Sequence, residues 1–475
     1  MINILHVSAE CTPFVKIGGL ADVVGSLPNE IKRLRGNDVR VFLPYYKAIP
    51  TKFRKKAELV TNFKIQFNSN KDVYVGVKKI KRGNILYYFI DNEFYFGSRE
   101  NVYNYGDEGE RYAYFQVAVL ESLSRIGFHP DIIHIHDWHT GMIPILMDKR
   151  FPKLHAKTVL TIHNLAYQGI FPLENYKFFN IKYDPLMEFE GFLNFLKCGI
   201  SKADLITTVS PTYAKEILTD YYGYGMQKLL LQRSSDLIGI LNGINYNEYN
   251  PEKDKLITKN YNLETVKEGK LINKKALFKE LGVDFSLDKP VIGLISRLVS
   301  QKGIDLIKRV FDEMLGIDDF YFIVLGSGEE QYENYFVGLE ERFSDKVKVY
   351  IGYSNKLAHM IYASCDMFLM PSKFEPCGLG QIIALKYGTI PIVRETGGLV
   401  DTVEPYNEYV KKGNGFSFTN FNAHDMMHVI RYAMHIYYHN PKSWDIIIKH
   451  AMESDYSWIQ SAKMYRKVYK SILKK

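Results

Sequence analysis

Two glycine-rich segments are the first features of the sequence that suggest chemistry. Gly18-Gly19 and Gly378-Leu379-Gly380 each precede an apolar pattern of helical spacing. Glycines at such a place let backbone N–H groups approach a phosphate closely, and the dipole of the following helix favours the negative charge. A tight turn explains either segment equally well when it is taken alone. The segments therefore indicate an anion site only in combination with other groups.

A pair of cations supplies that combination. Arg297 and Lys302 lie five residues apart across an expected strand-to-helix turn. A guanidinium fork and an ammonium point charge together suit a diphosphate that departs during a reaction. The sequence contains neither G-x-x-x-x-G-K-[ST] nor G-x-G-x-x-G, and it has no D-x-D triplet. These absences disfavour P-loop proteins, kinases, ordinary NAD enzymes and enzymes that hold a diphosphate through a divalent metal.

The segment from His134 to His139 has a metal interpretation and a structural one. His134, His136 and His139 are potential zinc ligands, but no cysteine or carboxylate cluster accompanies them at ligand spacing. We therefore expect no metal. In the same segment, Asp137 either caps the next helix or belongs to a site, and Trp138 either lies in the core or shapes a sugar pocket.

The second glycine segment raises similar alternatives. Glu375 either pairs with Lys373 at the surface or acts within the glycine loop. We expect Cys377 to be a small packed residue and not a nucleophile, because no helper base is evident nearby.

The elements that must position these residues alternate regularly. Short apolar runs rich in β-branched residues recur, each followed by a helix-like stretch, whereas the polar segment 242–289 lacks a strong strand. Near-continuous apolar runs are typical of parallel strands buried on both faces, and their alternation with helices predicts doubly wound α/β sheets. We expect strands at residues 2–7, 39–43, 85–90, 132–135, 158–162, 205–209, 291–295, 321–325, 347–351, 366–370, 390–393 and 415–418.

The polar and glycine-rich segments directly follow some of these strands. In such sheets, ligands bind beyond the carboxyl ends of the strands. Packing alone does not readily explain so many polar segments at one edge, so we expect binding sites there. The strands concerned are those at residues 2–7, 132–135, 158–162, 291–295, 366–370 and 390–393.

Length and composition limit the class of protein. The 475 residues exceed the roughly 300 that one hydrophobic core supports, so we expect two domains. The chain is 46% hydrophobic and 24% charged, and no run approaches the ~20 apolar residues of a membrane helix. Its net charge of +8 is mild and fits solvated surface better than nucleic-acid binding. Four scattered cysteines and a start without a signal-peptide pattern indicate a cytoplasmic protein.

Taken together, the motifs closely resemble those of the bacterial glycogen synthase and plant starch synthase family, which are retaining glucosyltransferases. The matching segments occur in the family's order and span nearly the whole chain. They are residues 16–23, 136–139, 161–169, 241–244, 296–298 with 301–303, 351–353, 374–379 and 396–403. Two positions depart from the family's pattern, because Gly380 stands where threonine is common and Asn245 where aspartate is common.

The resemblance implies the GT-B arrangement, in which two Rossmann-like, doubly wound domains face each other across a deep cleft. It implies an N-terminal, acceptor-side domain over residues 1–240, completed by a C-terminal helix at 455–475. The nucleotide-sugar-binding domain is expected over residues 241–454.

The resemblance also implies roles for individual residues. Arg297 and Lys302 would neutralise the leaving diphosphate, Glu375 would fix glucose hydroxyls, and His163 would lie over the transferred glucose. The other implied donor-binding positions are Lys16, Gly18, Gly19, Asn242, Tyr353, Gly378, Leu379, Gly380 and Thr396, with Tyr353 stacked on the nucleobase. The implied sugar-side or acceptor-side positions are Asp22, Tyr95, Asp137, Trp138, Asn164 and Cys377, with Tyr95 in contact with the growing glucan.

The implied activity is the transfer of glucose from ADP-glucose to the non-reducing end of an α-1,4-glucan such as glycogen, with retained configuration and no cofactor. Two alternatives stay open. One is an enzyme with the same clamp that uses UDP-glucose or another nucleotide sugar. The other is a non-catalytic glycan-binding protein on the same fold, which is disfavoured because such a protein has no use for a diphosphate clamp.

Overall fold

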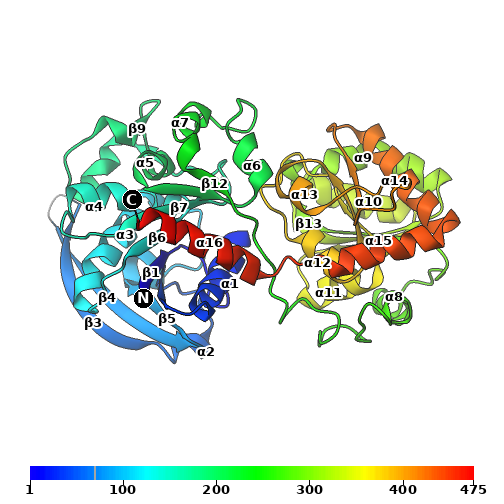
Figure 1. The fold of residues 1–475 in the computed structure, drawn as a ribbon, viewed down its shortest axis with the longest axis horizontal. Helices are drawn as coiled ribbons and strands as arrows, with labels where there is room; N and C mark the ends of the chain where they lie inside the picture. Colours follow the sequence, from blue (N-terminus) through cyan, green and yellow to red (C-terminus); the bar gives the residue numbers. More distant parts are fainter. Residues whose placement is uncertain (69–70, 475) are drawn as a thin grey trace. The chain divides into compact units, whose positions relative to one another are not determined.

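The computed structural model describes residues 1–68 and 71–474, which form two compact units. Unit 1 comprises Met1–Gly243 and Trp458–Lys475, and unit 2 comprises Ile244–Ser457. In each unit, helices cover a mainly parallel sheet (Figure 1). The expected α/β class with two doubly wound domains is therefore confirmed. Within the described residues, no helix is long and apolar enough to cross a membrane.

Unit 1 is built on one large sheet. Its strands are β1 (Ile2–Val7), β2 (Asn37–Pro44), β3 (Glu58–Phe67), β4 (Lys71–Arg82), β5 (Ile85–Asp91), β6 (Ile132–His136), β7 (Lys157–Ile162), β11 (Leu205–Thr208) and β12 (Leu237–Gly239). Their spatial order is β12-β11-β7-β6-β1-β2-β5-β4-β3. β2 follows β1 on one side, whereas β6, β7, β11 and β12 follow one another outward on the other side, so the topological switch point lies between β1 and β6. Ligands of such sheets bind at this point.

Helices and a small second sheet complete unit 1. The small sheet joins β8 (Ile170–Pro172), β9 (Glu188–Phe189) and β10 (Phe192–Asn194). The helices are α1 (Gly19–Arg33), α2 (Thr51–Arg54), α3 (Glu108–Arg125), α4 (Ile143–Lys149), α5 (Phe195–Lys202), α6 (Pro211–Glu216), α7 (Gln227–Gln232) and α16 (Trp458–Ile472). The C-terminal helix α16 packs against α1 (Figure 1), so the end of the chain stabilises the unit in which the chain begins.

The hairpin of β3 and β4 was not among the expected strands. These strands pair antiparallel at one edge of the sheet, and most of β3 is exposed or half-buried. An antiparallel strand with one solvated face alternates polar and apolar residues and has no continuous apolar run. The basic residues Lys81 and Arg82 at the end of β4 are exposed, which agrees with the interpretation of the net charge as solvated surface.

Unit 2 contains a fully parallel sheet. Its strands are β13 (Val291–Leu298), β14 (Tyr321–Gly328), β15 (Val347–Ile351), β16 (Met367–Met370), β17 (Ile390–Arg394) and β18 (Phe416–Phe418). Their order is β15-β14-β13-β16-β17-β18, which places the switch point between β13 and β16. The helices are α8 (Val266–Leu281), α9 (Ile304–Ile317), α10 (Glu330–Arg342), α11 (Asn355–Ser364), α12 (Gly380–Lys386), α13 (Gly397–Thr402), α14 (Ala423–His439) and α15 (Pro441–Glu453).

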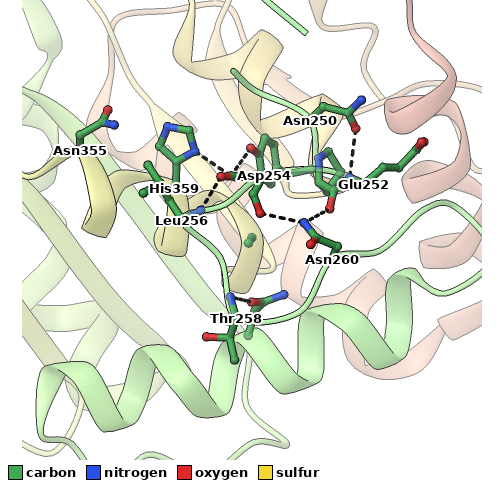
Figure 2. A network of polar contacts seen from close by, with 12 residues as sticks. Asn250, Glu252, Asp254, Leu256, Thr258, Asn260, Asn355 and His359 are labelled. Carbon is green, nitrogen blue, oxygen red and sulfur yellow. Dashed lines mark hydrogen bonds and ion pairs between the residues drawn. The ribbon is translucent and has the colours of Figure 1, made fainter. Parts of the chain in front are cut away.

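A buried polar network attaches the first segment of unit 2 to its helices (Figure 2). Asp254 Oδ2 lies 2.7 Å from Nδ1 of His359 and accepts a 2.6 Å hydrogen bond from the hydroxyl of Tyr387. The amide of Asn260 donates to the backbone oxygen of Asp254 at 2.8 Å. Burial raises the pKa of Asp254, but the hydrogen bonds from His359 and Tyr387 outweigh that effect and lower the pKa overall. The carboxylate thus holds a segment without regular structure in place.

Candidate active site

The loops that follow β13 and β16 meet at the switch point of unit 2. Lys302 Nζ lies 2.5 Å from Glu375 Oε2, and both side chains are largely buried. The same carboxylate oxygen accepts a 3.1 Å hydrogen bond from the hydroxyl of Ser372. The interpretation of Glu375 as a surface partner of Lys373 is therefore wrong, because its partner is Lys302.

Backbone contacts fix the two loops against each other. The N–H of Lys373 donates to the oxygen of Gln301 at 2.8 Å, and the Gln301 amide donates to the oxygen of Phe374 at 3.2 Å. Gly303 has a φ of 72°, and a Cβ there would lie 1.9 Å from the oxygen of Pro371. Only glycine allows this close approach, which places the start of α9 beside the Glu375 loop.

Arg394, which ends β17, braces the same loop from the other side. Its Nε donates to the oxygen of Ser372 at 2.8 Å, and its Nη2 donates to the oxygen of Lys373. Arg394 has no motif or spacing in the sequence that indicates a functional role. Its buried guanidinium binds backbone oxygens, and only the tertiary structure shows this role.

The glycine segment before α12 has its peptide groups oriented by Gln381. The side-chain amide of Gln381 donates to the oxygens of Cys377 at 2.9 Å and Gly378 at 3.1 Å. In a planar trans peptide, the C=O of one residue and the N–H of the next point in opposite directions. The N–H groups of Gly378 and Leu379 are therefore directed away from Gln381. Cys377 itself is buried, as expected for a packed residue.

Gly380, the position that departs from the family's pattern, begins α12. A Cβ at this position would lie 2.9 Å from Cε1 of Phe368, which is fully buried on β16. The aromatic ring thus occupies space that a side chain at position 380 would need.

The segment Thr396-Gly397-Gly398 supports Glu375 through its backbone. The N–H of Gly398 donates to the oxygen of Glu375 at 3.1 Å. Gly397 has a φ of 47°, and a Cβ there would lie 2.0 Å from the same oxygen. Thr396 is fully buried directly before α13. This segment holds the Glu375 backbone in place, which is a role that the sequence did not reveal.

Two further expected donor residues are exposed. Arg297 lies on β13 with its side chain in solvent, so the structure brings Lys302, and not Arg297, into contact with Glu375. Tyr353 is 76% exposed, and its hydroxyl donates to Oδ1 of Asn355 at 3.3 Å. An exposed guanidinium and an exposed ring are both available to a ligand.

In unit 1, a second lysine–carboxylate pair joins the loop after β1 to the first turn of α1. Lys16 Nζ lies 2.8 Å from Asp22 Oδ2. Burial raises the pKa of Asp22, and the charge of Lys16 opposes this rise. In each unit, therefore, a candidate cation at the switch point already has a carboxylate partner.

Glu10 organises the first glycine loop and was not singled out in the sequence. Its Oε2 accepts from the N–H groups of Ile17 at 2.7 Å and Gly18 at 2.9 Å, and its Oε1 accepts from the hydroxyl of Tyr103 at 2.7 Å. The amide of Gly18, expected to contact phosphate, thus donates to this carboxylate. Gly19 begins α1, where helix N–H groups favour an anion.

Asp137, at the end of β6, holds the loop that carries His163. Its Oδ1 accepts the N–H of His163 at 2.7 Å, and the N–H of Asn164 also binds the carboxylate. Burial raises the pKa of Asp137 to about 7, and these two backbone hydrogen bonds oppose the rise. The side chain caps no helix, so the capping interpretation is wrong. Oδ1 of Asn164 accepts the N–H of Ala166 at 3.1 Å.

Three other expected residues lie inside unit 1. Trp138 is 8% exposed and packs edge-to-face on Tyr112, which agrees with the core interpretation. Tyr95 is 4% exposed, and its hydroxyl donates to Oε1 of Glu110 at 2.7 Å. The adjacent Phe94 is 68% exposed, so it is the aromatic residue here that a partner can reach. Asn242 is buried at the end of unit 1.

Within the described residues, a potential metal-binding group consists of His6, His134 and His136. His139, the third histidine suggested by the sequence, is not part of it. Nδ1 of His134 lies 2.7 Å from the hydroxyl of Tyr469, and Nδ1 of His6 lies 3.1 Å from Nε2 of His136. A metal ion would have to replace such hydrogen bonds, so the geometry favours a hydrogen-bonded cluster.

Each half of the chain matches a known family model. Residues 3–232 match the starch synthase catalytic domain, and residues 279–449 match glycosyl transferases group 1. The glycogen synthase of Anoxybacillus flavithermus is 48% identical, with 99% of this chain and 98% of the relative covered. The glycogen synthase of Geobacillus stearothermophilus is 47% identical, with 100% and 98% covered.

Comparison with solved structures also finds glycosyltransferases. The catalytic domain of starch synthase IV from Arabidopsis thaliana, bound to ADP and acarbose, has a TM-score of 0.92 and 32% identity, and each chain is covered over its full length. Sucrose-phosphate synthase from Thermosynechococcus elongatus has a TM-score of 0.63 and 16% identity with 99% of each chain covered, so it shares the fold.

Proposed function

The chain belongs to the family of glycogen and starch synthases, retaining glycosyltransferases of the GT-B fold, and from this premise we propose that it elongates an α-1,4-glucan with glucose from ADP-glucose. The resemblance of the motifs to this family is confirmed by relatives that are 47–48% identical over almost the whole chain. The ADP bound to the starch synthase relative supports ADP-glucose as the donor.

The observation that carries the proposal is the contact between Lys302 and Glu375 at the switch point of unit 2. A diphosphate carries more negative charge than one carboxylate, so it competes for the ammonium group. We propose that Lys302 transfers from Glu375 to the donor diphosphate, together with the exposed Arg297. Glu375 is then free to bind glucose hydroxyls, as a positioning carboxylate and not as a nucleophile.

The backbone of the glycine segment complements these cations. The N–H groups of Gly378 and Leu379, which Gln381 directs through their peptide groups, would hold phosphate or glucose oxygens. Tyr353 would stack on the nucleobase. Preorganised donors of this kind stabilise the charge that develops on a leaving group.

In the proposed reaction, the bond between C1 of glucose and the diphosphate oxygen breaks, and C1 forms a bond with the 4-hydroxyl oxygen of the acceptor. The acceptor proton passes to the departing diphosphate on the same face, which retains the configuration. His163, held through its backbone by Asp137, would face the transferred glucose. In unit 1, Lys16 and the N-terminal end of α1 would bind the donor, and Asp22 would contribute to the sugar side.

We assign the acceptor side to residues 1–240 with 455–475 and the nucleotide-sugar side to residues 241–454. The two compact units, with boundaries at Gly243 and Ser457, support this division. We also propose a cytoplasmic location, which the four buried cysteines support because they form no disulfide among the described residues.

A donor competition tests the proposal. Purified protein is incubated with glycogen and equal concentrations of ADP-glucose and UDP-glucose, of which one is radiolabelled at a time, with and without EDTA. We expect label to enter glycogen preferentially from ADP-glucose and equally well in EDTA. Preference for UDP-glucose would overturn the donor assignment, and no incorporation from either donor would favour a glycan-binding protein.

A further inference from the structure

The loop that carries His163 rests on two fully buried imidazoles. Nε2 of His163 lies 3.0 Å from Nδ1 of His136, and Nε2 of His136 lies 3.1 Å from Nδ1 of His6. His136 ends β6 and His6 lies on the neighbouring strand β1, so the centre of the sheet fixes both rings. His163 alone of the three is not fully buried and keeps partial contact with solvent.

All three rings are neutral near pH 7. Burial lowers the pKa of His6 and of His163 to about 3, and burial lowers the pKa of His136 well below its ordinary value. A neutral imidazole carries one proton, so one ring nitrogen donates and the other accepts. The two N···N contacts therefore each need one protonated and one unprotonated nitrogen.

These requirements leave only two arrangements. Either His6 donates from Nδ1 to His136 and His136 donates from Nδ1 to His163, or both hydrogen bonds run in the opposite direction from Nε2. In the first arrangement every ring is protonated on Nδ1, and in the second every ring is protonated on Nε2. A mixed arrangement would place two protons or two lone pairs in one contact.

The far end of the chain of rings lies at His6. Its Nε2 is buried and has no hydrogen-bond partner among the described residues, so no further group couples to it. At the near end, no described residue binds Nδ1 of His163, which leaves that nitrogen to solvent or substrate. The direction of the chain thus decides whether His163 offers a donor or an acceptor there.

We propose that His6 and His136 are positioning residues that, through a shared tautomer, fix which nitrogen of His163 carries the proton. His134 lies beside these rings but outside the chain, because its two nitrogens bind the hydroxyls of Tyr469 at 2.7 Å and Thr161 at 2.6 Å. The consequence for catalysis rests on the proposed function, whereas the shared tautomer does not.

NMR spectroscopy of the full chain, with ¹⁵N-labelled histidine, tests the coupling without any substrate. Two-bond ¹H–¹⁵N correlations distinguish Nδ1-protonated from Nε2-protonated rings, and single substitutions assign the signals. We expect His6, His136 and His163 to show one common tautomer at neutral pH. Different tautomers among the three rings, or a stoichiometric metal ion bound to His6 and His136, would overturn the proposal.

Variants of His6 test the consequence for catalysis. His6→Leu removes the contact with His136, whereas His6→Asn retains a polar group near the position of Nδ1. We expect His6→Leu to lower kcat by about tenfold, with an unchanged KM for ADP-glucose, and to allow a tautomer mixture at His163. His6→Asn should recover most of the rate and the single tautomer. Equal loss in both variants would overturn the proposal.

Tyr469→Phe is the matched control. It removes a buried hydrogen bond to His134 in the same cluster but leaves the chain of rings intact. We expect its kcat to stay within about twofold of the wild-type value, because the hydrogen bond that it loses lies outside the chain of rings. A loss of rate equal to that of His6→Leu would indicate a general packing effect and would overturn the proposal. If the wild-type protein shows the shared tautomer but transfers no glucose, the result contradicts the proposed function and leaves the coupling of the three rings intact.

Discussion

Lys302 and Glu375 neutralise each other across the switch point of unit 2, with Nζ and Oε2 separated by 2.5 Å. Lys16 and Asp22 repeat the arrangement in unit 1 at 2.8 Å. A partly buried cation without a partner would pay a desolvation penalty, which a nearby carboxylate reduces. We propose that an arriving diphosphate takes over the cation, which leaves a carboxylate free for the sugar.

Replacement of Lys302 tests this exchange. We expect Lys302→Ala to lower kcat by about 100-fold or more, because roughly 3 kcal/mol of leaving-group stabilisation is lost. Steady-state kinetics with ADP-glucose and glycogen measures the effect. The control is Lys356→Ala, which removes an exposed pair with Glu280 in the same unit and should leave kcat unchanged. Wild-type turnover in Lys302→Ala would contradict the clamp assignment.

The departure at Gly380 has a structural explanation that predicts coupling with Phe368. Threonine at position 380 would bring a Cβ within 2.9 Å of the buried ring, so we expect Gly380→Thr to destabilise unit 2 by about 1–3 kcal/mol. In a Phe368→Leu background the same change should cost much less. Urea unfolding of the four proteins in this double-mutant cycle measures the coupling, and strictly additive effects would refute the explanation.

The raised pKa of Asp137 predicts that the free energy of unfolding depends on pH. Burial raises the pKa of its carboxyl group to about 7, whereas an unfolded aspartate titrates near about 3.9. Between these two pKa values the carboxyl group of Asp137 is protonated more often in the folded protein than in the unfolded chain. Its contribution to the free energy of unfolding therefore falls as pH rises. Asparagine does not titrate. Urea unfolding at about pH 5 and about pH 8 should show the wild type losing stability relative to Asp137→Asn, and a constant difference would contradict this account.

The lowered pKa of Asp254 predicts the opposite dependence of stability on pH. Its pKa is lowered in the folded state, so its contribution to stability is present above the unfolded pKa and is lost as pH falls through the folded pKa. We expect Asp254→Asn to cost about 3 kcal/mol at neutral pH, because the hydrogen bonds from His359 and Tyr387 lose a charged acceptor. The deficit should shrink in acid. Asp445→Asn, at an exposed pair with Lys267, is the matched control and should change stability by less than about 1 kcal/mol at any pH.

The buried strands of both sheets were predictable because each is a short, nearly continuous apolar run. Each expected strand is present, with small differences at its ends. Helix α8 was not predicted, because polar residues lie on its buried face. Lys274 pairs with Asp366 at 2.8 Å, and Lys270 donates to the hydroxyl of Thr389 at 2.6 Å. Only the tertiary structure supplies those partners, so the sequence pattern alone looked like a polar connection.

The candidate site was predictable where a residue follows a strand at a switch point, as Glu375 and Lys302 do. The groups that position these residues were not predictable. Glu10, Gln381 and Arg394 act by binding backbone atoms of other segments, and no spacing in the sequence indicates such contacts. A resemblance between motifs also does not show burial, which places the ring of Tyr95 inside unit 1.

The proposed reaction adds glucose in α-1,4 linkage at non-reducing ends of a glucan, and digestion of the product measures this linkage directly. Radiolabelled ADP-glucose and glycogen are incubated with the purified protein, and the washed product is digested with β-amylase, which releases maltose from non-reducing α-1,4 ends. We expect label to enter the glucan and β-amylase to release it as labelled maltose. Label that resists this digestion, or no incorporation at all, would contradict the proposed reaction.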